Sequence, residues 1–242
     1  DRLASAVTRK TRCVMINSPN NPTGAVMSKI ALEGIAKVAV ENDLRVISDE
    51  VYEKLIYSGE GHVSIASLDG MGERALTINS FSKTYAMTGW RVGYCVADEA
   101  TVSKMVKFQG FLAACPVAFA QYAVAKALAD PRSATSVEAM RREYQARRDY
   151  THQRLSSIPG IEVMKPEGAF YIFPRIGGDD VTFSEELLSE ARVVVVPGSS
   201  FGTHGNGHIR LCYATSMESI TKAMDRLEEF MSARATRRAG RR

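Results

Sequence analysis

Short apolar segments that resemble buried strands alternate with helix-like segments through the first half of the chain. The strand candidates are residues 11–17, 44–49, 75–80 and 91–97. An amphipathic helix is predicted between the first two of them, from Ser28, which would cap it, to about Glu41. Such alternation is typical of α/β domains in which helices cover a mainly parallel sheet. Disordered chains, collagen and coiled coils are excluded, because 45% of the residues are apolar and 24% are charged.

The pattern changes after Asp130-Pro131, where we expect a helix to stop. A long, arginine-rich helix is predicted over residues 133–156, followed by short strands and two further helices. This order of elements indicates an α+β unit. We therefore place a domain boundary near residue 140, so that residues 1–140 form one domain and residues 141–233 form a smaller one.

The formal net charge of +4 comes from the end of the chain. Residues 234–242 carry five arginines and no acidic residue, and without them 26 basic residues face 27 acidic ones. Such a run predicts a basic, disordered tail, with an interaction arm as the alternative. The rest of the chain is nearly neutral, so no nucleic-acid-binding surface is indicated.

The four cysteines are far apart and form no CxxC pair: Cys13, Cys95, Cys115 and Cys212. This favours a reduced, cytoplasmic protein over a disulfide framework or a zinc site. The four histidines show no metal-ligand spacing either, and we expect no metal. Residues 111–129 are apolar enough to resemble a membrane span, but they are rich in alanine and contain Pro116 and Lys126, so we interpret them as packed helix.

Polar residues gather at three places where predicted strands end, which is where ligands bind in open α/β sheets. The first place is NNPTG at residues 20–24, and the second is DEVY at residues 49–52. Each also has a structural explanation when taken alone. Asn, Pro and Gly are ordinary turn residues, and an aspartate often caps the next helix.

The third segment, SFSKTYAMTGWRVG at residues 80–93, is the most informative. Lys83 follows an apolar strand and has hydroxyl groups on both sides; burial there would lower its pKa and make its amine nucleophilic. Arg91 follows eight residues later, and serines together with an arginine can cradle a phosphate. A lone lysine is usually a surface residue, but the position between two apolar strands favours a site.

These three motifs, in this order, resemble those of the pyridoxal-phosphate-dependent class I/II aminotransferases, the aspartate aminotransferase superfamily of fold type I. The downstream segments GAFYIFP, VVVVPGSSFG and HIRLCYA resemble the family as well, so the similarity extends from Thr11 to about Met231. The resemblance implies a three-layer α/β large domain with a mainly parallel sheet and a smaller α+β C-terminal domain. It also implies a cytoplasmic, homodimeric enzyme that transfers an amino group between an amino acid and a 2-oxo acid by a ping-pong mechanism.

The resemblance assigns catalytic roles to the matching residues. Lys83 would hold pyridoxal 5'-phosphate as a Schiff base and later move a proton between the substrate and the cofactor. Asp49 would pair with the protonated pyridine nitrogen and keep the ring an electron sink. Tyr52 and Asn21 would hydrogen-bond the 3-oxygen of the ring, and the Asn21-Pro22 bond is expected to be cis.

The remaining roles concern the phosphate and the substrate. Ser80, Ser82 and Arg91 would bind the cofactor phosphate. Arg210, in HIRLCYA, would bind the α-carboxylate of the substrate, since its planar fork fits a carboxylate, and Asn21 would assist there. These residues indicate only an α-carboxylate and do not select the substrate's side chain.

Family members carry a long segment before the equivalent of Thr11, which supplies part of the phosphate site and an aromatic residue that stacks on the ring. The chain begins at Asp1 without an initiator Met, so we expect it to be the C-terminal portion of such an enzyme. Residues 1–140 would then be the C-terminal part of the cofactor-binding domain. A sensor domain of a transcription regulator, a pyridoxal-phosphate-dependent lyase or synthase, and an inert fragment remain alternatives.

Overall fold

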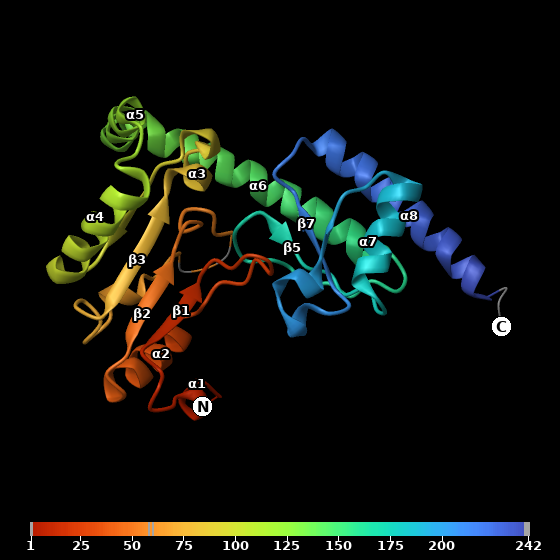
Figure 1. Ribbon diagram of the computed structural model, residues 1–242. Coiled ribbons are helices and arrows are strands. Elements are labelled where there is room, and N and C mark those ends of the chain that lie inside the picture. Colours follow the sequence, from red (N-terminus) through yellow and green to blue (C-terminus); the bar gives the residue numbers. More distant parts are fainter. Residues whose placement is uncertain (1, 58, 60, 240–242) are drawn as a thin grey trace. The chain divides into compact units, whose positions relative to one another are not determined.

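The computed structural model describes residues 2–57, 59 and 61–239, and these form two compact units (Figure 1). The first unit comprises Asp1–Pro19 and Val26–Ala139, and the second comprises Asn20–Ala25 and Met140–Arg242. Residues 20–25, which are the NNPTG motif and Ala25, therefore belong to the second unit by their contacts. Most of the first unit follows them in the sequence.

A four-stranded sheet forms the centre of the first unit (Figure 1). Its strands, in spatial order, are β1 (Cys13–Asn17), β2 (Arg45–Asp49), β3 (Ala75–Ser80) and β4 (Gly93–Val96). The first three run parallel, with Asn17 beside Asp49 and Asp49 beside Ile78. β4 is antiparallel and pairs Gly93 with Ser80. The predicted α/β fold with a mainly parallel sheet is confirmed.

The helix α2 (Lys29–Glu41) packs against this sheet, and the short helix α1 (Arg2–Ala6) precedes β1. Ser28 caps α2 as predicted, because its hydroxyl oxygen accepts the N–H of Ala31 at 3.2 Å. The apolar core between helix and sheet includes Ile16, Leu32, Ala36, Ala39 and Val46. Because β1, β2 and β3 run parallel, their carboxyl ends share one edge of the sheet.

The segments after the lysine motif are helical. They are α3 (Phe81–Thr84), the 3₁₀ turn η2 (Thr88–Trp90), α4 (Glu99–Ala113) and α5 (Ala118–Ala129), and the 3₁₀ turn η1 (Ile65–Ser67) lies between β2 and β3. Residues 111–129 are helical except at 114–117, as expected, but they are packed only in part: Ala120 and Val124 are buried, whereas other side chains are exposed. Phe111 is 93% exposed and Tyr122 is 81% exposed. In the described part of the chain, no helix combines the length and apolarity needed to cross a bilayer.

The helix α5 ends at Ala129, so the predicted stop at Asp130-Pro131 is confirmed; the long helix α6 (Pro131–Ser157) begins at that proline, two residues before its predicted start. Proline suits the first turn, because the N–H that it lacks would have no partner there. Asp130 precedes it, and its carboxyl oxygen accepts the N–H of Arg132 at 3.0 Å. The division between the two units falls inside this helix, between Ala139 and Met140.

The second unit contains the C-terminal part of α6, a small antiparallel sheet and two further helices (Figure 1). Its strands, in spatial order, are β5 (Tyr171–Ile172), β7 (Ile209–Cys212) and β6 (Val196–Pro197). The helices are α7 (Asp180–Ala191) and α8 (Met217–Ala239), and two 3₁₀ turns, η3 (Gly198–Phe201) and η4 (Thr203–Gly205), link β6 to β7. Phe183 of α7 meets Phe230 of α8 edge to face, with ring centroids 5.5 Å apart. This is α+β order, as expected.

The prediction of a disordered tail over 234–242 is wrong for the part that the structure describes, since α8 continues through Ala239. Arg234 forms an ion pair with Glu186 of α7, and its guanidinium lies 5.0 Å from the Phe183 ring centroid. Arg237 pairs with Glu190, one helical turn further along α7, at 2.9 Å. The arginines looked unpaired in the sequence because their acidic partners precede them by 47 or 48 residues. Residues 240–242 lie outside the described residues.

Candidate active site

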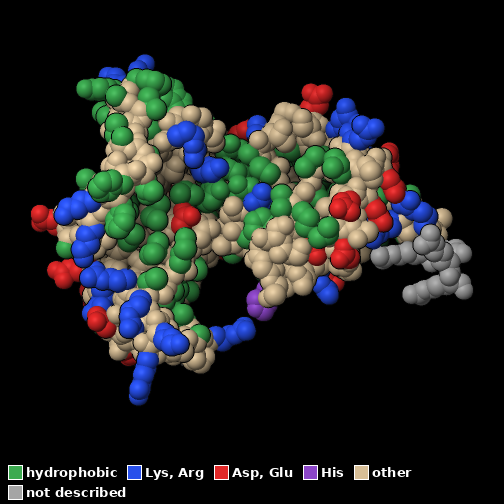
Figure 2. Space-filling model, in the orientation of Figure 1, with side chains coloured by type: hydrophobic (Ala, Val, Ile, Leu, Met, Phe, Trp, Pro, Cys, Tyr) green, Lys and Arg blue, Asp and Glu red, His purple; other side chains and the backbone are tan. Residues whose placement is uncertain are grey.

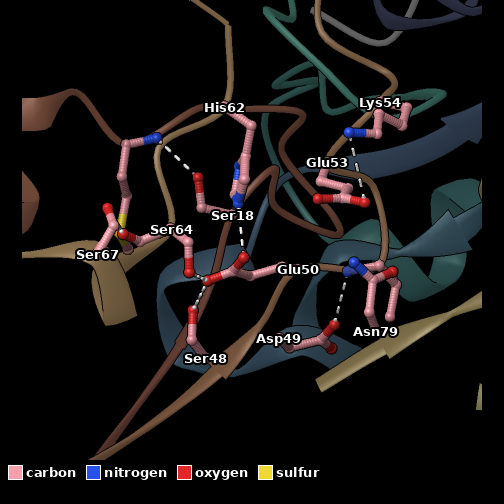
Figure 3. A network of polar contacts seen from close by, with 12 residues as sticks. Ser18, Ser48, Asp49, Glu50, Glu53, Lys54, His62, Ser64, Ser67 and Asn79 are labelled. Atoms are coloured by element: carbon pink, nitrogen blue, oxygen red, sulfur yellow. Dashed lines mark hydrogen bonds and ion pairs between the residues drawn. The ribbon is translucent and has the colours of Figure 1, made fainter. Parts of the chain in front are cut away.

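Asp49 ends β2, at the carboxyl edge of the sheet (Figure 3). Its carboxyl oxygen Oδ1 accepts the N–H of Val51 at 3.3 Å. Partial burial has the largest effect and raises the pKa of Asp49; the hydrogen bond from Val51 opposes this, and the charge of Glu50 adds to it. A cation beside Asp49 would lower that pKa again, because it favours the charged form.

Tyr52 lies in the turn that follows, and its side chain is only 3% exposed. Its backbone carbonyl accepts the N–H of Leu55 at 2.8 Å, and the carbonyl of Glu50 accepts the N–H of Glu53 at 2.9 Å. The N–H of Glu50 donates to Ile78 of β3 at 2.9 Å. These bonds fix the DEVY turn to the ends of both strands.

Glu50 is the centre of a buried polar network that the sequence did not reveal (Figure 3). Its Oε1 accepts the hydroxyls of Ser48 and Ser64, both at 2.8 Å, and its Oε2 lies 2.7 Å from His62 Nε2. Burial has the largest single effect and raises the pKa of Glu50, but the hydrogen bonds from His62, Ser64 and Ser48 together outweigh it, so the pKa lies below its ordinary value. His62 thus ties the loop before η1 to the end of β2.

Ser80, at the end of β3, forms hydrogen bonds with the segments on both sides of Lys83. Its hydroxyl oxygen accepts the N–H of Ser82 at 3.1 Å, which caps α3, and its hydroxyl donates to the carbonyl of Val92 at 3.3 Å. Lys83 follows in α3 and is partly buried, whereas Ser82 is buried. A single hydroxyl therefore holds together the strand end, the lysine helix and the residue before β4.

Arg91 follows η2 in a left-handed conformation, with φ 55° and ψ 47°, and its Nη1 donates to the carbonyl of Thr88 at 2.9 Å. Its side chain is exposed. Two residues later, Gly93 pairs with Ser80, and a Cβ at Gly93 would lie 2.8 Å from the carbonyl oxygen of Asn79. This close approach of β4 to β3 requires glycine, and it keeps the Arg91 segment next to Ser80.

The NNPTG motif forms a tight turn in the second unit. Asn20 Oδ1 accepts the N–H and the hydroxyl of Thr23, at 3.2 and 2.7 Å, and the carbonyl of Asn20 accepts the N–H of Gly24 at 2.9 Å. Gly24 has φ +71°, and a Cβ there would lie 2.6 Å from Pro166 Cβ. The last position of the motif therefore requires glycine for both conformation and space.

The guanidinium of Arg210, on β7, is held by three side chains of the second unit. Its Nη1 donates to Asn21 Oδ1 at 2.8 Å, and its Cζ lies 4.5 Å from the ring centroid of Tyr171 and 4.9 Å from that of Phe201. Its Nε is buried and has no hydrogen-bond partner among the residues that the structure describes. The Asn21-Pro22 peptide bond is cis, as expected.

The predicted site residues fall into two groups, each inside one unit. The ends of β2 and β3 and the turns after them carry Asp49, Tyr52, Ser80, Ser82, Lys83 and Arg91. The second unit brings together Asn21 and Arg210, which are 189 residues apart in the sequence. Parallel strands explain the first group, because β2 and β3 end side by side.

Comparison with known proteins gives concordant matches. The family model for aminotransferase class I and II matches residues 1–227. The chain is 56% identical over 234 residues to aromatic-amino-acid aminotransferase 2 of Thermococcus litoralis and to an aspartate aminotransferase of Pyrococcus abyssi, covering 96% of this chain and 60% of each relative. The solved aromatic aminotransferase of Pyrococcus horikoshii has a TM-score of 0.94 at 55% identity, covering 96% of this chain and 63% of that one.

A more distant solved structure, the aspartate aminotransferase of Thermotoga maritima, has a TM-score of 0.88 at 40% identity and covers 96% of this chain and 59% of that one. The chain thus spans about three fifths of the length of these relatives. The relatives are named as aminotransferases, so the sensor-domain alternative is not favoured. Both the sequence motifs and the fold place the chain in one group: it belongs to the class I and II aminotransferases.

Proposed function

We propose that this protein transfers an amino group between an amino acid and a 2-oxo acid. The observation that carries the proposal is the position of Lys83 directly after β3, with Asp49 at the end of the neighbouring strand β2. Enzymes of this family depend on pyridoxal 5'-phosphate. The two units would correspond to the C-terminal part of a cofactor-binding domain and to a small domain.

The chemistry of the donor set in the first unit fits this cofactor. A carboxylate matches a protonated pyridine nitrogen, an amine matches an aldehyde, and two serines with an arginine match a phosphate. Asp49, Lys83, Ser80, Ser82 and Arg91 supply these groups at one edge of the sheet. When bound, pyridoxal phosphate supplies an electron sink that stabilises negative charge at the substrate's Cα.

Each residue would then have a defined task. Lys83 Nζ would hold the cofactor's aldehyde carbon until the substrate's amine replaces it, and would then move a proton between the substrate's Cα and the cofactor's C4′. Asp49 would keep the ring nitrogen protonated, because its partly buried carboxylate is stabilised by a cation. Tyr52 would donate a hydrogen bond to the ring's 3-oxygen, and Ser80, Ser82 and Arg91 would bind the phosphate. A contact of Asn21 with the 3-oxygen stays a prediction.

Arg210 would bind the α-carboxylate of the substrate. Two aromatic rings and Asn21 orient its guanidinium, so little side-chain freedom remains to be lost on binding. The Nε of Arg210 has no hydrogen-bond acceptor among the described residues, and a bound carboxylate would supply acceptors to this guanidinium. The names of the relatives favour aspartate or an aromatic amino acid as the amino donor.

We expect the working protein to be a cytoplasmic homodimer. Apolar side chains gather over α4 and α5 of the first unit (Figure 2), and they include Phe108, Phe111, Leu112, Phe119 and Tyr122. An exposed apolar surface of this kind supports association between protein subunits. The four cysteines are free thiols, which fits a reducing compartment. Light scattering of the cofactor-loaded protein gives the oligomeric state directly.

Borohydride reduction tests the central assignment. We expect it to fix the cofactor to the peptide that contains Lys83, as read by proteolysis and mass spectrometry. Lys83→Ala should lose the label and the activity, whereas Lys107→Ala, at an exposed position on α4, should retain both. A label on another lysine, or none on the cofactor-loaded protein, would contradict the proposal.

A panel of amino donors then defines the substrate. Aspartate, phenylalanine, tyrosine and alanine are added singly to the cofactor-loaded protein, and the loss of the absorbance of the bound aldehyde form is followed. We expect aspartate or an aromatic donor to react fastest. A protein that carries the label on Lys83 but converts none of the donors would not be an aminotransferase.

A further inference from the structure

In residues 198–207, which lie between β6 and β7, the two limbs of the loop approach each other closely at Gly198 and Gly205. A Cβ at Gly198 would lie 2.2 Å from the carbonyl oxygen of Gly205, and a Cβ at Gly205 would lie 2.0 Å from that of Gly198. Any other residue at either position would push the two limbs of the loop apart. The loop therefore has a compact shape that requires glycine at both positions.

Asp180, the first residue of α7, holds both limbs of this loop. Its Oδ2 accepts the N–H of Ser199 at 2.8 Å, and its Oδ1 accepts the N–H of Gly207 at 3.2 Å. The residue is 4% exposed. Burial has the largest effect and raises the pKa of Asp180, but the hydrogen bonds from Ser199 and Gly207 outweigh it, so the pKa lies below its ordinary value. The clamp is therefore a charged carboxylate at neutral pH.

Phe201 connects the loop to the substrate arginine. Its ring centroid lies 4.9 Å from Arg210 Cζ, on one side of a guanidinium that also contacts Tyr171. Phe173 meets the Phe201 ring edge to face, with centroids 6.0 Å apart, and Phe173 stacks on His208. A cation over an aromatic face is attracted by the ring, so the position of Phe201 helps to set that of the guanidinium.

We infer that Asp180 is a positioning residue for carboxylate binding: it clamps the loop 198–207 and thereby seats Phe201 against Arg210. The inference deepens the proposed function and rests on the role proposed there for Arg210. Asp180 itself touches backbone N–H groups of the loop and acts through Phe201. Binding a carboxylate would be weaker without the clamp, because the arginine would have to be ordered at the moment of binding.

The test compares Asp180→Asn with Asp179→Asn in the cofactor-loaded protein. Asparagine at 180 has one acceptor oxygen for two N–H donors, so one limb of the loop is released. Asp179 is exposed and caps α7 by accepting the N–H of Thr182, a bond that asparagine can also accept, so this control removes a neighbouring charge and keeps the clamp. The dissociation constants of maleate and of 3-phenylpropionate are measured by calorimetry.

We expect Asp180→Asn to weaken at least one of the two probes about tenfold, with a matching rise in the KM of the amino donor and a smaller change in kcat. Asp179→Asn should leave these constants within about twofold. Unchanged probe affinity in a folded Asp180→Asn protein would overturn the inference. Thermal unfolding and circular dichroism establish that the variants are folded.

A second variant separates positioning from a general loss of stability. Phe201→Leu removes the aromatic face and leaves Asp180 and its hydrogen bonds in place. If Asp180 acts through Phe201, the double variant loses no more probe affinity than the more affected single variant. Losses that add up in the double variant would show that Asp180 acts by another route.

Failure of the positioning inference can be distinguished from failure of the proposed function. Borohydride labelling of Lys83 is carried out on the wild type and on every variant, and it reports cofactor binding independently of the carboxylate probes. An unlabelled wild type contradicts the proposed function. A labelled Asp180→Asn protein with wild-type probe affinity contradicts only the positioning inference.

Discussion

At the scale of single residues, Glu50 shows most clearly that a buried side chain depends on partners that only the folded chain brings together. A carboxylate buried without donors would be strongly unfavourable, and its donors come from Ser48, Ser64 and His62. The last two lie on a loop that begins more than ten residues later in the chain. The network stabilises the turn that carries Asp49 and Tyr52, so it supports the site without belonging to the reacting groups.

We predict that Glu50→Gln lowers the free energy of unfolding at pH 7 by about 1–3 kcal/mol, because the amide nitrogen cannot accept one of the three hydrogen bonds. The native pKa of Glu50 lies below its ordinary value of 4.5. The unfolded chain therefore binds this proton more readily, and the stability that the charge provides is complete above pH 4.5 and is lost as the pH falls through the native pKa. Urea unfolding at several pH values measures this.

The matched control is Glu33→Gln. Glu33 is exposed and forms an i,i+4 pair with Lys29 at 3.9 Å, which contributes a few tenths of a kcal/mol. It should change stability by less than about 0.5 kcal/mol at any pH. If Glu50→Gln behaved like this control, or if its deficit grew towards acid pH, the network would not have the energetic role described.

At the scale of elements, local signals predicted the interior of helices better than their ends. The cap of α2 at Ser28 was readable, because the capping side chain and the N–H that it accepts are three residues apart. The stop at Asp130-Pro131 was also readable, and α5 ends there, but α6 begins at Pro131, two residues before its predicted start, because proline suits the first turn of a helix. The extension of α8 was missed because Glu186 and Glu190, on a different helix, pair with its arginines.

The contact between η3 and η4 gives an element-scale prediction. Gly198→Ala should destabilise the protein by about 1–3 kcal/mol, because its Cβ would meet the backbone oxygens of Gly205 and His208 at 2.2 and 2.7 Å. Gly34→Ala is the control: Gly34 lies in α2 with open space where a methyl group would lie, and alanine there should stabilise by about 0.5–1 kcal/mol. Opposite signs in thermal unfolding are expected, and a neutral Gly198→Ala would mean that the loop relaxes freely.

At the scale of the whole molecule, the chain contributes residues 20–25 to the second unit. The carbonyl of Gly24 accepts the N–H groups of Glu167 and Gly168 at 2.9 and 2.8 Å, so the motif before β2 closes a loop that begins well over 100 residues later. The same turn carries Asn21, the hydrogen-bond partner of Arg210. The second unit is therefore built from two distant pieces of sequence.

We predict that Gly24→Ala speeds amide hydrogen exchange in peptides containing Glu167 and Gly168 and leaves peptides of β2 and β3 protected. The reason is the left-handed φ of +71° together with the 2.6 Å approach to Pro166. Gly177→Ala has a similar φ of +65° but open space, and it should perturb exchange less. Faster exchange spread evenly over both units would contradict this division.

Features that depend on neighbours along the chain could be predicted from the sequence. Alternating segments predicted the α/β unit, and the hydroxyl-flanked Lys83 after a strand predicted the site at the sheet edge. The resemblance to a family added Asn21 and Arg210, which no local pattern connects. These features were accessible because strand periodicity, caps and motifs act over a few residues.

Which distant groups meet depends on the tertiary structure. The pairing of Arg210 with Asn21 spans 189 residues, the hydrogen bonds of Asp180 span 19 and 27, and Arg234 finds Glu186 on another helix. Buried carboxylates and guanidinium groups must find partners to offset desolvation, yet any of several polar residues could serve. Only the packing of helices and strands brings one of them within hydrogen-bond distance, and for that reason the clamp at Asp180 and the network at Glu50 have no signature in the sequence.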